Sequence, residues 1–183
     1  TSDRYYEFRA RFNALSGDDI EKSALFIYLN RHAFNGLCRY NKKGAFNVPF
    51  GKYHNPKFPV ERMIDFSIRA RKAEFKCQDF RETFKSVRAD DVIYCDPPYI
   101  PLSETSSFTS YSKDKFDLSD HADLAKEAIH AKRQGSQCLI SNHDLDLTRE
   151  LYREALIYEL LVQRNITSRS ASRLKIAEIV AVF

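Results

Sequence analysis

Residues 92–99 read VIYCDPPY, and this stretch decides the fold class of the chain. Its first four residues are typical of an apolar strand, and an acid, two prolines and a tyrosine follow at the carboxyl end of that strand. Because proline fixes its own φ angle and restricts the residue before it, Asp96 and Pro97 are expected in a stiff, extended turn. In open α/β sheets ligands bind at this edge, so the turn is the first candidate site.

Strand and helix patterns alternate around this stretch. Helices are predicted at residues 79–84, 121–134 and 147–154. Strands are predicted at residues 74–77, 91–95, 137–141, 156–164 and 174–183, the last two as a hairpin across the polar loop 165–173. This alternation indicates an α/β fold in which a mainly parallel sheet is flanked by helices and the hairpin supplies an antiparallel edge.

The first 72 residues follow a different pattern. Helices are predicted at residues 18–30, capped by Asp18 or Asp19, and at residues 60–72. A further helix is expected upstream, where an aromatic face is formed by Tyr5, Tyr6, Phe8 and Phe12. Residues 31–59 instead contain the glycines, prolines and asparagines of loops and turns. A loop of this length inside a compact domain is usually functional.

Basic side chains are concentrated in one part of the chain. Residues 31–72 carry ten Lys or Arg and two acidic residues, Glu61 and Asp65, whereas residues 73–183 are slightly acidic. A basic section of this kind is typical of a surface that binds a polyanion. A solvated, lysine-rich face explains the charge alone equally well.

Composition excludes several classes of protein. No apolar run reaches the roughly 18–20 residues that span a membrane, and no signal-peptide pattern opens the chain, so a cytoplasmic protein is expected. The four cysteines, Cys38, Cys77, Cys95 and Cys138, are widely spaced and have no nearby histidine partner. This spacing predicts neither a metal site nor a disulfide framework.

The turn at residues 96–99 suits the methylation of an exocyclic amine. The lone pair of such an amine is delocalised into the ring, and a carboxylate and a carbonyl that accept its two N–H bonds would favour the pyramidal form that attacks. The ring of Tyr99 would stack on the base, which has to leave the duplex to reach the pocket. The alternative is a turn that only ends the strand.

DPPY at residues 96–99 resembles the catalytic motif of the amino-methyltransferases that act on adenine. Residues 30–41 (NRHAFNGLCRYN) and 44–53 (GAFNVPFGKY) resemble the target-recognition region of Dam-type DNA adenine methyltransferases, which methylate the adenine of GATC. Further matches occur at residues 102–103, 108–111, 140–144 and 147–149. The resemblance covers most of the chain and implies a Rossmann-like methyltransferase sheet with a helical and loop insertion for target recognition.

The resemblance assigns roles to individual residues. Catalytic positions are matched by Asp96, Pro97, Pro98 and Tyr99. Arg39 matches an arginine that reads guanine, a contact that suits the geometry of the arginine side chain. Phe34 matches an aromatic residue that inserts near the flipped adenine, and Asn35 one that helps to fill the vacated space. Apolar base contacts are implied for Leu37 and Pro49, and phosphate or backbone contacts for Arg31, Asn41, Asn47 and Lys52. Phe108 and Tyr111 either close the adenine pocket or pack in the core.

S-adenosylmethionine is the methyl donor that the resemblance implies, and no metal is needed. Donor contacts are implied for Asp96, which borders the methionine portion, and for Asp79 and Phe80 around the adenine portion. Members of the family open with a Phe-x-Gly-x-Gly-like donor loop, whereas this chain contains no G-x-G sequence. The first two strands of the sheet are therefore expected upstream of Thr1, so the sheet here is incomplete. We expect residues 1–183 to be inactive alone and the full-length parent to methylate DNA.

Three functions remain after these observations. The first is an S-adenosylmethionine-dependent, adenine-specific DNA methyltransferase that acts on double-stranded DNA. In that case residues 1–72 form the DNA-binding region and residues 73–183 the catalytic region. A non-catalytic, sequence-specific DNA-binding module explains residues 31–53 but not an intact DPPY, and methylation of another amine explains DPPY but not residues 31–53. An incomplete sheet would also expose an edge through which two copies could dimerise.

Overall fold

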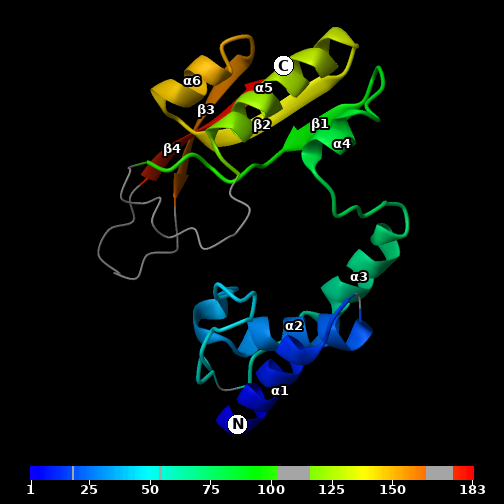
Figure 1. Ribbon diagram of the computed structural model, residues 1–183, viewed down its shortest axis with the longest axis vertical. Helices are drawn as coiled ribbons and strands as arrows, with labels where there is room; N and C mark the ends of the chain where they lie inside the picture. The colour runs from blue at the N-terminus through cyan, green and yellow to red at the C-terminus, as the bar shows by residue number, and fades with distance from the viewer. Residues whose placement is uncertain (18, 54, 103–115, 164–174) are drawn as a thin grey trace. The chain divides into compact units, whose positions relative to one another are not determined.

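The structure is a computed structural model that describes residues 1–17, 19–53, 55–102, 116–163 and 175–183. The chain divides into two compact units, with the boundary between Phe75 and Lys76. The first unit is built on helices, and the second carries a sheet with further helices (Figure 1). None of the described helices is long and apolar enough to cross a membrane.

Two capped helices form the first unit. At the start of α1 (Ser2–Ala14) the Thr1 hydroxyl accepts a hydrogen bond from the Arg4 N–H, at 3.5 Å. At the start of α2 (Ile20–His32) the Asp19 carboxylate accepts one from the Glu21 N–H, at 2.7 Å. Helix α1 confirms the predicted aromatic helix, and Asp19 is confirmed as the cap of α2. The other candidate cap, Asp18, lies outside the described residues.

An apolar core joins these two helices. Tyr5 and Phe12 lie seven residues apart on one face of α1, and Leu25 and Leu29 lie four residues apart on one face of α2. The Leu29 side chain is 0% exposed, and burial of a leucine stabilises the fold by about 1.5–3 kcal/mol. The same core takes in side chains from the segment after α2, namely Ala33, Phe46 and Val48.

The segment predicted as a loop after α2 is folded back on itself. It begins with the short 3-10 helix η1 (Phe34–Gly36). Two isolated antiparallel bridges then pair Ala33 with Phe50 and Tyr40 with Phe46. The helix α3 (Val60–Ala70) follows, starts where it was predicted and ends two residues early; none of its side chains is buried. Loop residues are thus fixed by bridges and by the apolar core rather than by helical periodicity.

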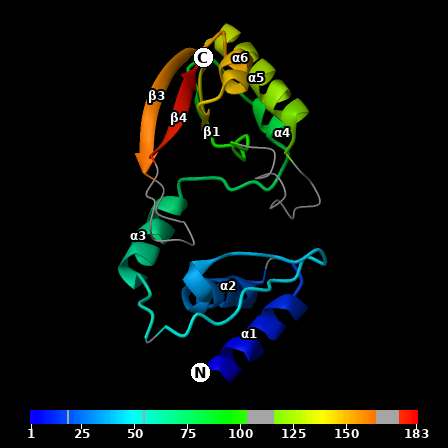
Figure 2. The same cartoon turned by 90° about the vertical axis from the view of Figure 1, so that its left-hand side faces the viewer.

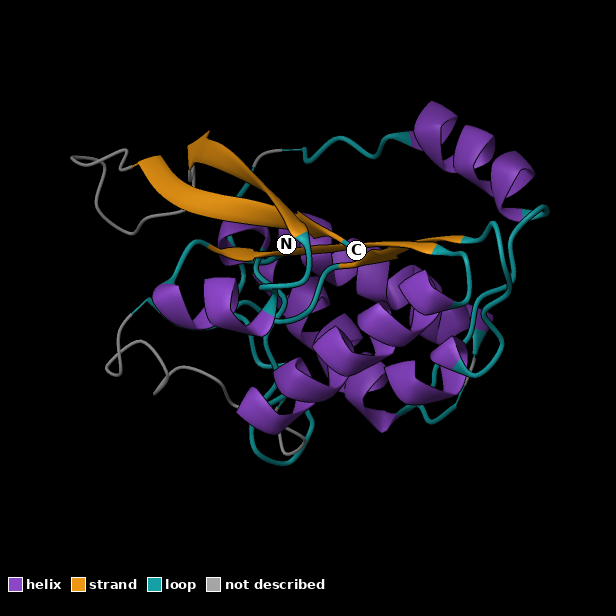
Figure 3. Ribbon diagram, turned by 90° about the horizontal axis from the view of Figure 1, so that it is seen from above, coloured by secondary structure: helices purple, strands orange, loops and turns teal. Residues whose placement is uncertain are grey.

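The second unit contains a mixed sheet whose strands run in the order β1-β2-β4-β3. The strand bounds are Val92–Cys95 for β1, Gln137–His143 for β2, Leu156–Gln163 for β3 and Lys175–Val182 for β4. Strands β1 and β2 are parallel, and β4 is antiparallel to both β2 and β3. Figure 3 shows the strands as one twisted sheet.

The prediction of a mainly parallel sheet is wrong for the described strands. The predicted hairpin of the last two strands is confirmed, although its loop at residues 165–173 lies outside the described residues. Its second strand, β4, inserts next to β2, which leaves one parallel and two antiparallel pairings. A hairpin can enter a sheet by either of its strands, and local sequence does not choose between them.

Three helices cover one face of the sheet, as Figure 2 shows. They are α4 (Phe80–Phe84), α5 (Leu118–Arg133) and α6 (Asp146–Leu151). Helix α5 starts three residues before its predicted position because Asp117 and Asp120 form a capping box. Its face with Leu124 and Ala128 packs on Cys138 and Ile140 of the sheet. This core fixes β1 and β2 side by side.

No strand forms at residues 74–77, contrary to the prediction. Phe75 is 71% exposed and Cys77 is also exposed. A strand requires a neighbour that completes its ladder of backbone hydrogen bonds. The described sheet begins at β1, so the alternation in this stretch produces an extended segment without a ladder.

Candidate active site and nucleic-acid interface

The DPPY turn follows the last residue of β1. The parallel register pairs Cys95 with Ile140, so Asp96 lies beside Ser141 on the neighbouring strand. The Ser141 hydroxyl donates to Asp96 Oδ1 at 3.0 Å. Asp96 is exposed while Pro97 is buried. The turn therefore presents one oriented carboxylate at the carboxyl edge of two parallel strands.

Ser141 connects Asp96 to a second side chain on β1. The hydroxyl of Tyr94 donates to Ser141 Oγ at 3.2 Å, and Ser141 is only 4% exposed. A serine hydroxyl has a single proton, and Ser141 Oγ has two acceptors in reach, Asp96 Oδ1 at 3.0 Å and the Cys95 carbonyl at 3.4 Å. The shorter distance and the negative charge of the carboxylate favour Asp96. This relay fixes the carboxylate without a charged partner.

Tyr99 is half-buried, and its ring meets the edge of His143 at a centroid distance of 5.1 Å and an interplanar angle of 83°. Burial raises the pKa of Tyr99 above its ordinary value, and the negative charges of Glu178 and Asp96 act in the same direction, against a hydrogen bond with Ser141. The side chain is consequently a neutral phenol at physiological pH. A neutral, oriented ring suits stacking on a flat base.

Buried side chains of β2 hold the residue that follows Tyr99. The Ile100 N–H donates to Asn142 Oδ1 at 3.0 Å, and His143 Nδ1 lies 2.7 Å from the Ile100 carbonyl oxygen. Asn142 Nδ2 in turn donates to the hydroxyl of Tyr152 at 3.1 Å. Asn142 is 0% exposed and His143 is 5% exposed. Both backbone groups of Ile100 are therefore anchored in the core.

His121 of α5 contacts the turn at the backbone of Pro98. Its ring is 3% exposed and meets Phe116 edge to face at 4.8 Å. Burial lowers the pKa of His121, and this outweighs the charge of Asp120 and a hydrogen bond to the backbone of Pro98. Its Nδ1 has no hydrogen-bond partner among the described residues. The ring is thus held neutral beneath the turn.

The two residues expected near the donor adenine already have structural contacts. The Asp79 carboxylate caps α4 by accepting from the Arg81 N–H at 2.8 Å, and it pairs with the Arg81 guanidinium at 3.2 Å. Phe80 is half-buried, packs against Phe116 at 5.6 Å and carries the Arg81 guanidinium 4.4 Å from its ring centroid. None of these contacts involves Asp96. Their role toward a donor stays a prediction.

Arg81 binds α4 to α5 through further carboxylates. Its Nη2 lies 2.8 Å from Asp120 and 2.7 Å from Asp123. The bonds to Arg81 are the largest cause of the lowered pKa of Asp120 and of Asp123. This cluster joins one guanidinium to three carboxylates, those of Asp79, Asp120 and Asp123, and so supports the packing of α4 on α5.

Two apolar residues of the expected nucleic-acid interface project from the first unit. Phe34 is 50% exposed and Leu37 is 40% exposed. The Phe34 N–H donates to the carbonyl of Pro49 at 2.9 Å, which joins the two ends of the folded segment. An exposed phenylalanine on a backbone that is tied down is suited to insert between bases.

Asn35 occupies the turn between Phe34 and Leu37 in a left-handed conformation, with φ of +52°. Asparagine tolerates this conformation better than most residues. The hydroxyl of Tyr53 accepts from the Asn35 N–H at 2.9 Å, and Asn30 Nδ2 donates to the Gly36 carbonyl at 2.8 Å. Two side chains without an assigned role, Tyr53 and Asn30, thereby set the shape of the loop.

Some polar side chains of the expected nucleic-acid interface form hydrogen bonds within the first unit, and others do not. The side-chain Oδ1 of Asn41 accepts from the N–H groups of Lys43 and Ala45, at 2.9 and 3.1 Å, and so shapes a turn. Asn47 Oδ1 accepts from Arg39 Nε at 2.8 Å. The side chains of Arg31 and Lys52 are exposed, and none of the described side-chain hydrogen bonds involves them.

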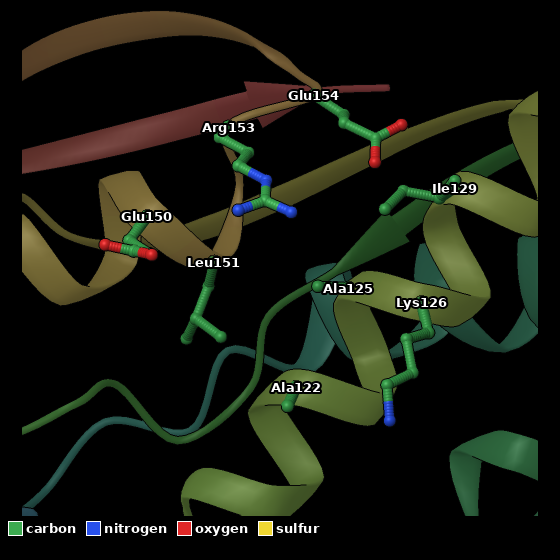
Figure 4. Close-up of a pocket in the computed structure, with 8 residues that line it drawn as sticks. All are labelled: Ala122, Ala125, Lys126, Ile129, Glu150, Leu151, Arg153 and Glu154. Carbon is green, nitrogen blue, oxygen red and sulfur yellow. The ribbon is translucent and has the colours of Figure 1, made fainter.

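Other candidate sites are weaker. No group of three or more His, Cys, Asp or Glu among the described residues is arranged to hold a metal ion. A pocket of about 250 Å³ lies between α5 and α6 (Figure 4). It is lined by Ala122, Ala125, Lys126, Ile129, Glu150, Leu151, Arg153 and Glu154. None of these residues belongs to the DPPY turn. Phe108 and Tyr111, which were expected near the adenine pocket or in the core, lie outside the described residues.

Sequence reasoning assigned no role to Ser141, Asn142 and His143, although residues 140–144 belong to the matched stretches. One signal could have found them. They end the strand next to the DPPY strand, and polar residues at adjacent carboxyl ends in a parallel pair are expected to meet. The predicted strand stopped at Ser141, two residues before β2 ends.

Known proteins resemble the whole chain. Residues 1–166 match the family described as D12 class N6 adenine-specific DNA methyltransferase. The chain is 48% identical over 180 residues to a DNA adenine methylase of Vibrio cholerae, an alignment that covers 98% of this chain and 65% of the relative. It is 47% identical over 186 residues to that of Haemophilus influenzae, with 100% and 64% covered. It is 45% identical over 181 residues to that of Escherichia coli K12, with 98% and 64% covered.

The chain therefore spans about 65% of the length of these curated relatives. Membership of a methyltransferase family implies a Rossmann-like fold, and the second unit contains a mixed sheet with helices. The resemblance read from DPPY and from residues 30–53 is confirmed by a match that runs over both units. This chain belongs to the D12 class of N6 adenine-specific DNA methyltransferases.

Proposed function

We propose that this chain carries the DNA-reading and catalytic parts of an enzyme that transfers a methyl group from S-adenosylmethionine to N6 of adenine in double-stranded DNA, within GATC. One observation carries the proposal. In a chain of this family, Ser141 orients Asp96 at 3.0 Å, directly before Pro97, Pro98 and Tyr99 at the carboxyl edge of parallel strands. A protein that only binds DNA has no use for an oriented carboxylate of this kind.

The turn would orient the amine of a flipped adenine. The Asp96 carboxylate and the Pro97 carbonyl are each able to accept one N6–H bond, which localises the nitrogen lone pair for attack. Tyr99, a neutral phenol held by His143, would stack on the base. When N6 forms its new bond it loses one proton, which Asp96 is placed to hold before it passes to water. The acceleration comes from orientation and fixed hydrogen bonds.

S-adenosylmethionine supplies an electrophilic methyl group when it is bound. Asp96, which is exposed, would border the methionine portion of the donor, and Asp79 and Phe80 would lie around its adenine portion while they keep their contacts with Arg81 and Phe116. The G-x-G sequence typical of the donor loop in this family does not occur in these 183 residues. We therefore propose that the donor is held mainly by residues outside these 183.

The first unit would read the DNA. Phe34 would insert beside the flipped adenine, and Arg39 would contact guanine in the major groove. Leu37 and Pro49 would make apolar base contacts, with Asn35 helping to fill the vacated space. Arg31 and Lys52 would contact phosphates, which position the protein without specifying sequence. Exposure of all seven side chains supports this assignment.

Methyl transfer from labelled S-adenosylmethionine to a hemimethylated GATC duplex tests the proposal. We would compare residues 1–183 with a protein extended upstream to the length of the relatives, and each with its Asp96→Ala and Arg39→Ala variants. We expect activity only in the extended protein. Asp96→Ala should abolish transfer while DNA binding persists, and Arg39→Ala should weaken or redirect it.

Retained GATC binding without transfer in the extended protein would contradict the catalytic part of the proposal. The chain would then be a non-catalytic DNA reader. Transfer by residues 1–183 alone would contradict the proposed division of the donor site.

A further inference from the structure

Three hydrogen bonds join Arg39 to Asn47. The Asn47 N–H donates to the Arg39 carbonyl at 3.0 Å. In the opposite direction, Arg39 Nε donates to Asn47 Oδ1 at 2.8 Å, and Arg39 Nη2 donates to the Asn47 carbonyl at 3.4 Å. Backbone and guanidinium of one residue are thus tied to a single partner eight positions away.

Asn47 is itself held on a rigid support. Its two chain neighbours, Phe46 and Val48, are 1% and 0% exposed in the core of the first unit. Asn13 of α1 makes two hydrogen bonds with the Phe46 backbone: its Oδ1 accepts from the N–H at 2.8 Å and its Nδ2 donates to the carbonyl at 3.1 Å. The hydroxyl of Tyr5 donates to the Val48 carbonyl at 3.0 Å. Asn47 is therefore the outward-facing residue of a segment anchored to α1.

The bonds to Asn47 select which donors of Arg39 remain available. A guanidinium group has five N–H donors in a fixed planar fork. Asn47 takes Nε–H and one N–H of Nη2, and within the described part of the chain no acceptor is found for Nη1. The outer edge formed by Nη1 and Nη2 is left, and its two parallel donors match the O6 and N7 acceptors of guanine.

We infer that Asn47 is a specificity-determining residue, which holds the guanidinium of Arg39 in the orientation that reads guanine. The inference rests on the proposed function, because it requires that Arg39 reads DNA. It replaces the phosphate contact that the family resemblance implied for Asn47. A phosphate contact changes binding to every duplex alike, whereas an orienting residue changes binding only where the correct base is present.

The test measures dissociation constants of the full chain at one salt concentration for two duplexes. One contains GATC, and in the other the G·C pair whose guanine Arg39 is proposed to read is replaced by A·T. The ratio of the two constants is the discrimination. Asn47→Ala should lower this ratio about tenfold, through weaker binding to GATC, and should leave binding to the replaced duplex unchanged. A tenfold change corresponds to about 1.4 kcal/mol, within the range of one bidentate base contact.

Two further variants make the result specific. Asn47→Asp keeps the Oδ1 acceptor and should retain the discrimination, although its negative charge weakens binding to both duplexes. In an Arg39→Ala background, Asn47→Ala should cause no further loss of discrimination. Circular dichroism of each variant establishes that the chain is folded, and the expected fold is retained because Asn47→Ala preserves the backbone bond to Arg39.

Equal weakening on both duplexes by Asn47→Ala would overturn the inference and restore the phosphate contact. Discrimination unchanged by Asn47→Ala would overturn it as well. If the unmodified chain does not discriminate between the duplexes, the DNA-reading part of the proposed function fails, and this inference fails with it. The first two results leave the proposed function intact.

Discussion

Ser141 Oγ lies 3.0 Å from Asp96 Oδ1 and accepts a hydrogen bond from Tyr94 at 3.2 Å, so a buried hydroxyl sets the direction of the exposed carboxylate. Ser141→Ala should lower the rate of methyl transfer about tenfold or more, because a hydrogen bond to a charged group contributes about 1.5–3 kcal/mol. DNA affinity should be unchanged. Single-turnover rates of the extended protein would measure the effect.

Tyr94→Phe is the matched control, since it removes only the bond that directs Ser141. We expect it to reduce the rate less than Ser141→Ala does. A full rate for Ser141→Ala would show that Asp96 needs no orientation from this residue.

Asn142 should be the most sensitive polar residue for stability in the second unit. Asn142→Ala removes the side chain that contacts two buried groups, the N–H of Ile100 and the hydroxyl of Tyr152. A buried polar group without a partner costs about 1–3 kcal/mol, so the loss in unfolding free energy should reach about 2–4 kcal/mol. Urea denaturation followed by circular dichroism would measure it.

Gln78→Ala is the comparison for an exposed amide. Gln78 Nε2 donates to Thr83 Oγ1 at 3.0 Å on the surface, and its loss should change the free energy of unfolding by less than about 0.5 kcal/mol. Similar losses for the two variants would mean that burial does not increase the contribution of Asn142 to the free energy of unfolding.

Stability should fall as the pH drops below the ordinary histidine pKa of 6.5, through His121. Burial lowers the pKa of this ring in the folded protein, so the unfolded chain takes up its proton first. The contribution of His121 to the free energy of unfolding is therefore complete above pH 6.5 and decreases progressively below pH 6.5. The free energy of unfolding, measured between about pH 7.5 and 5, would give the slope; over this range ordinary carboxylates stay ionised.

His121→Gln cannot titrate and should flatten this slope. His130→Gln is the matched control at an exposed position of the same helix. A slope that survives in His121→Gln would assign the pH dependence to other groups.

Gly51→Ala should distort the folded segment after α2 by a steric clash. A Cβ at this position would lie 2.8 Å from the Ala33 carbonyl oxygen and 2.5 Å from Tyr53 Cε2. Tyr53 holds the turn at Asn35, so its displacement should weaken GATC binding, and overpacking should cost about 1–3 kcal/mol of stability. Thermal unfolding and duplex affinity would be measured together.

Gly44→Asn is the corresponding control. Gly44 has φ of +76° with no heavy atom within 4 Å of an added Cβ, and asparagine tolerates a positive φ. Binding should persist in this variant. Unchanged binding in Gly51→Ala would show that the Tyr53 side chain can move away without a change in the DNA-binding conformation of the loop.

Local sequence was sufficient to predict the elements that depend on residues close together in the chain. Asp19, one of the two predicted caps, caps α2, since an N-cap bond joins residues two or three positions apart. The hairpin of β3 and β4 was also predicted, from two apolar runs around a polar loop. In contrast, residues 74–77 alternate like a strand but lack a ladder, because pairing depends on a neighbour that local alternation does not specify.

By itself the sequence determined the family, the strand that precedes Asp96 and the residues expected to touch DNA, because motif spacing and residue chemistry are properties of the chain. Tertiary structure decided which side chains act on those residues. The parallel register brings Ser141 to Asp96, 45 positions away, and anchoring on α1 brings Asn47 to Arg39. Both contacts arise from the burial of apolar neighbours, which fixes strand register and loop position only when the whole core is formed.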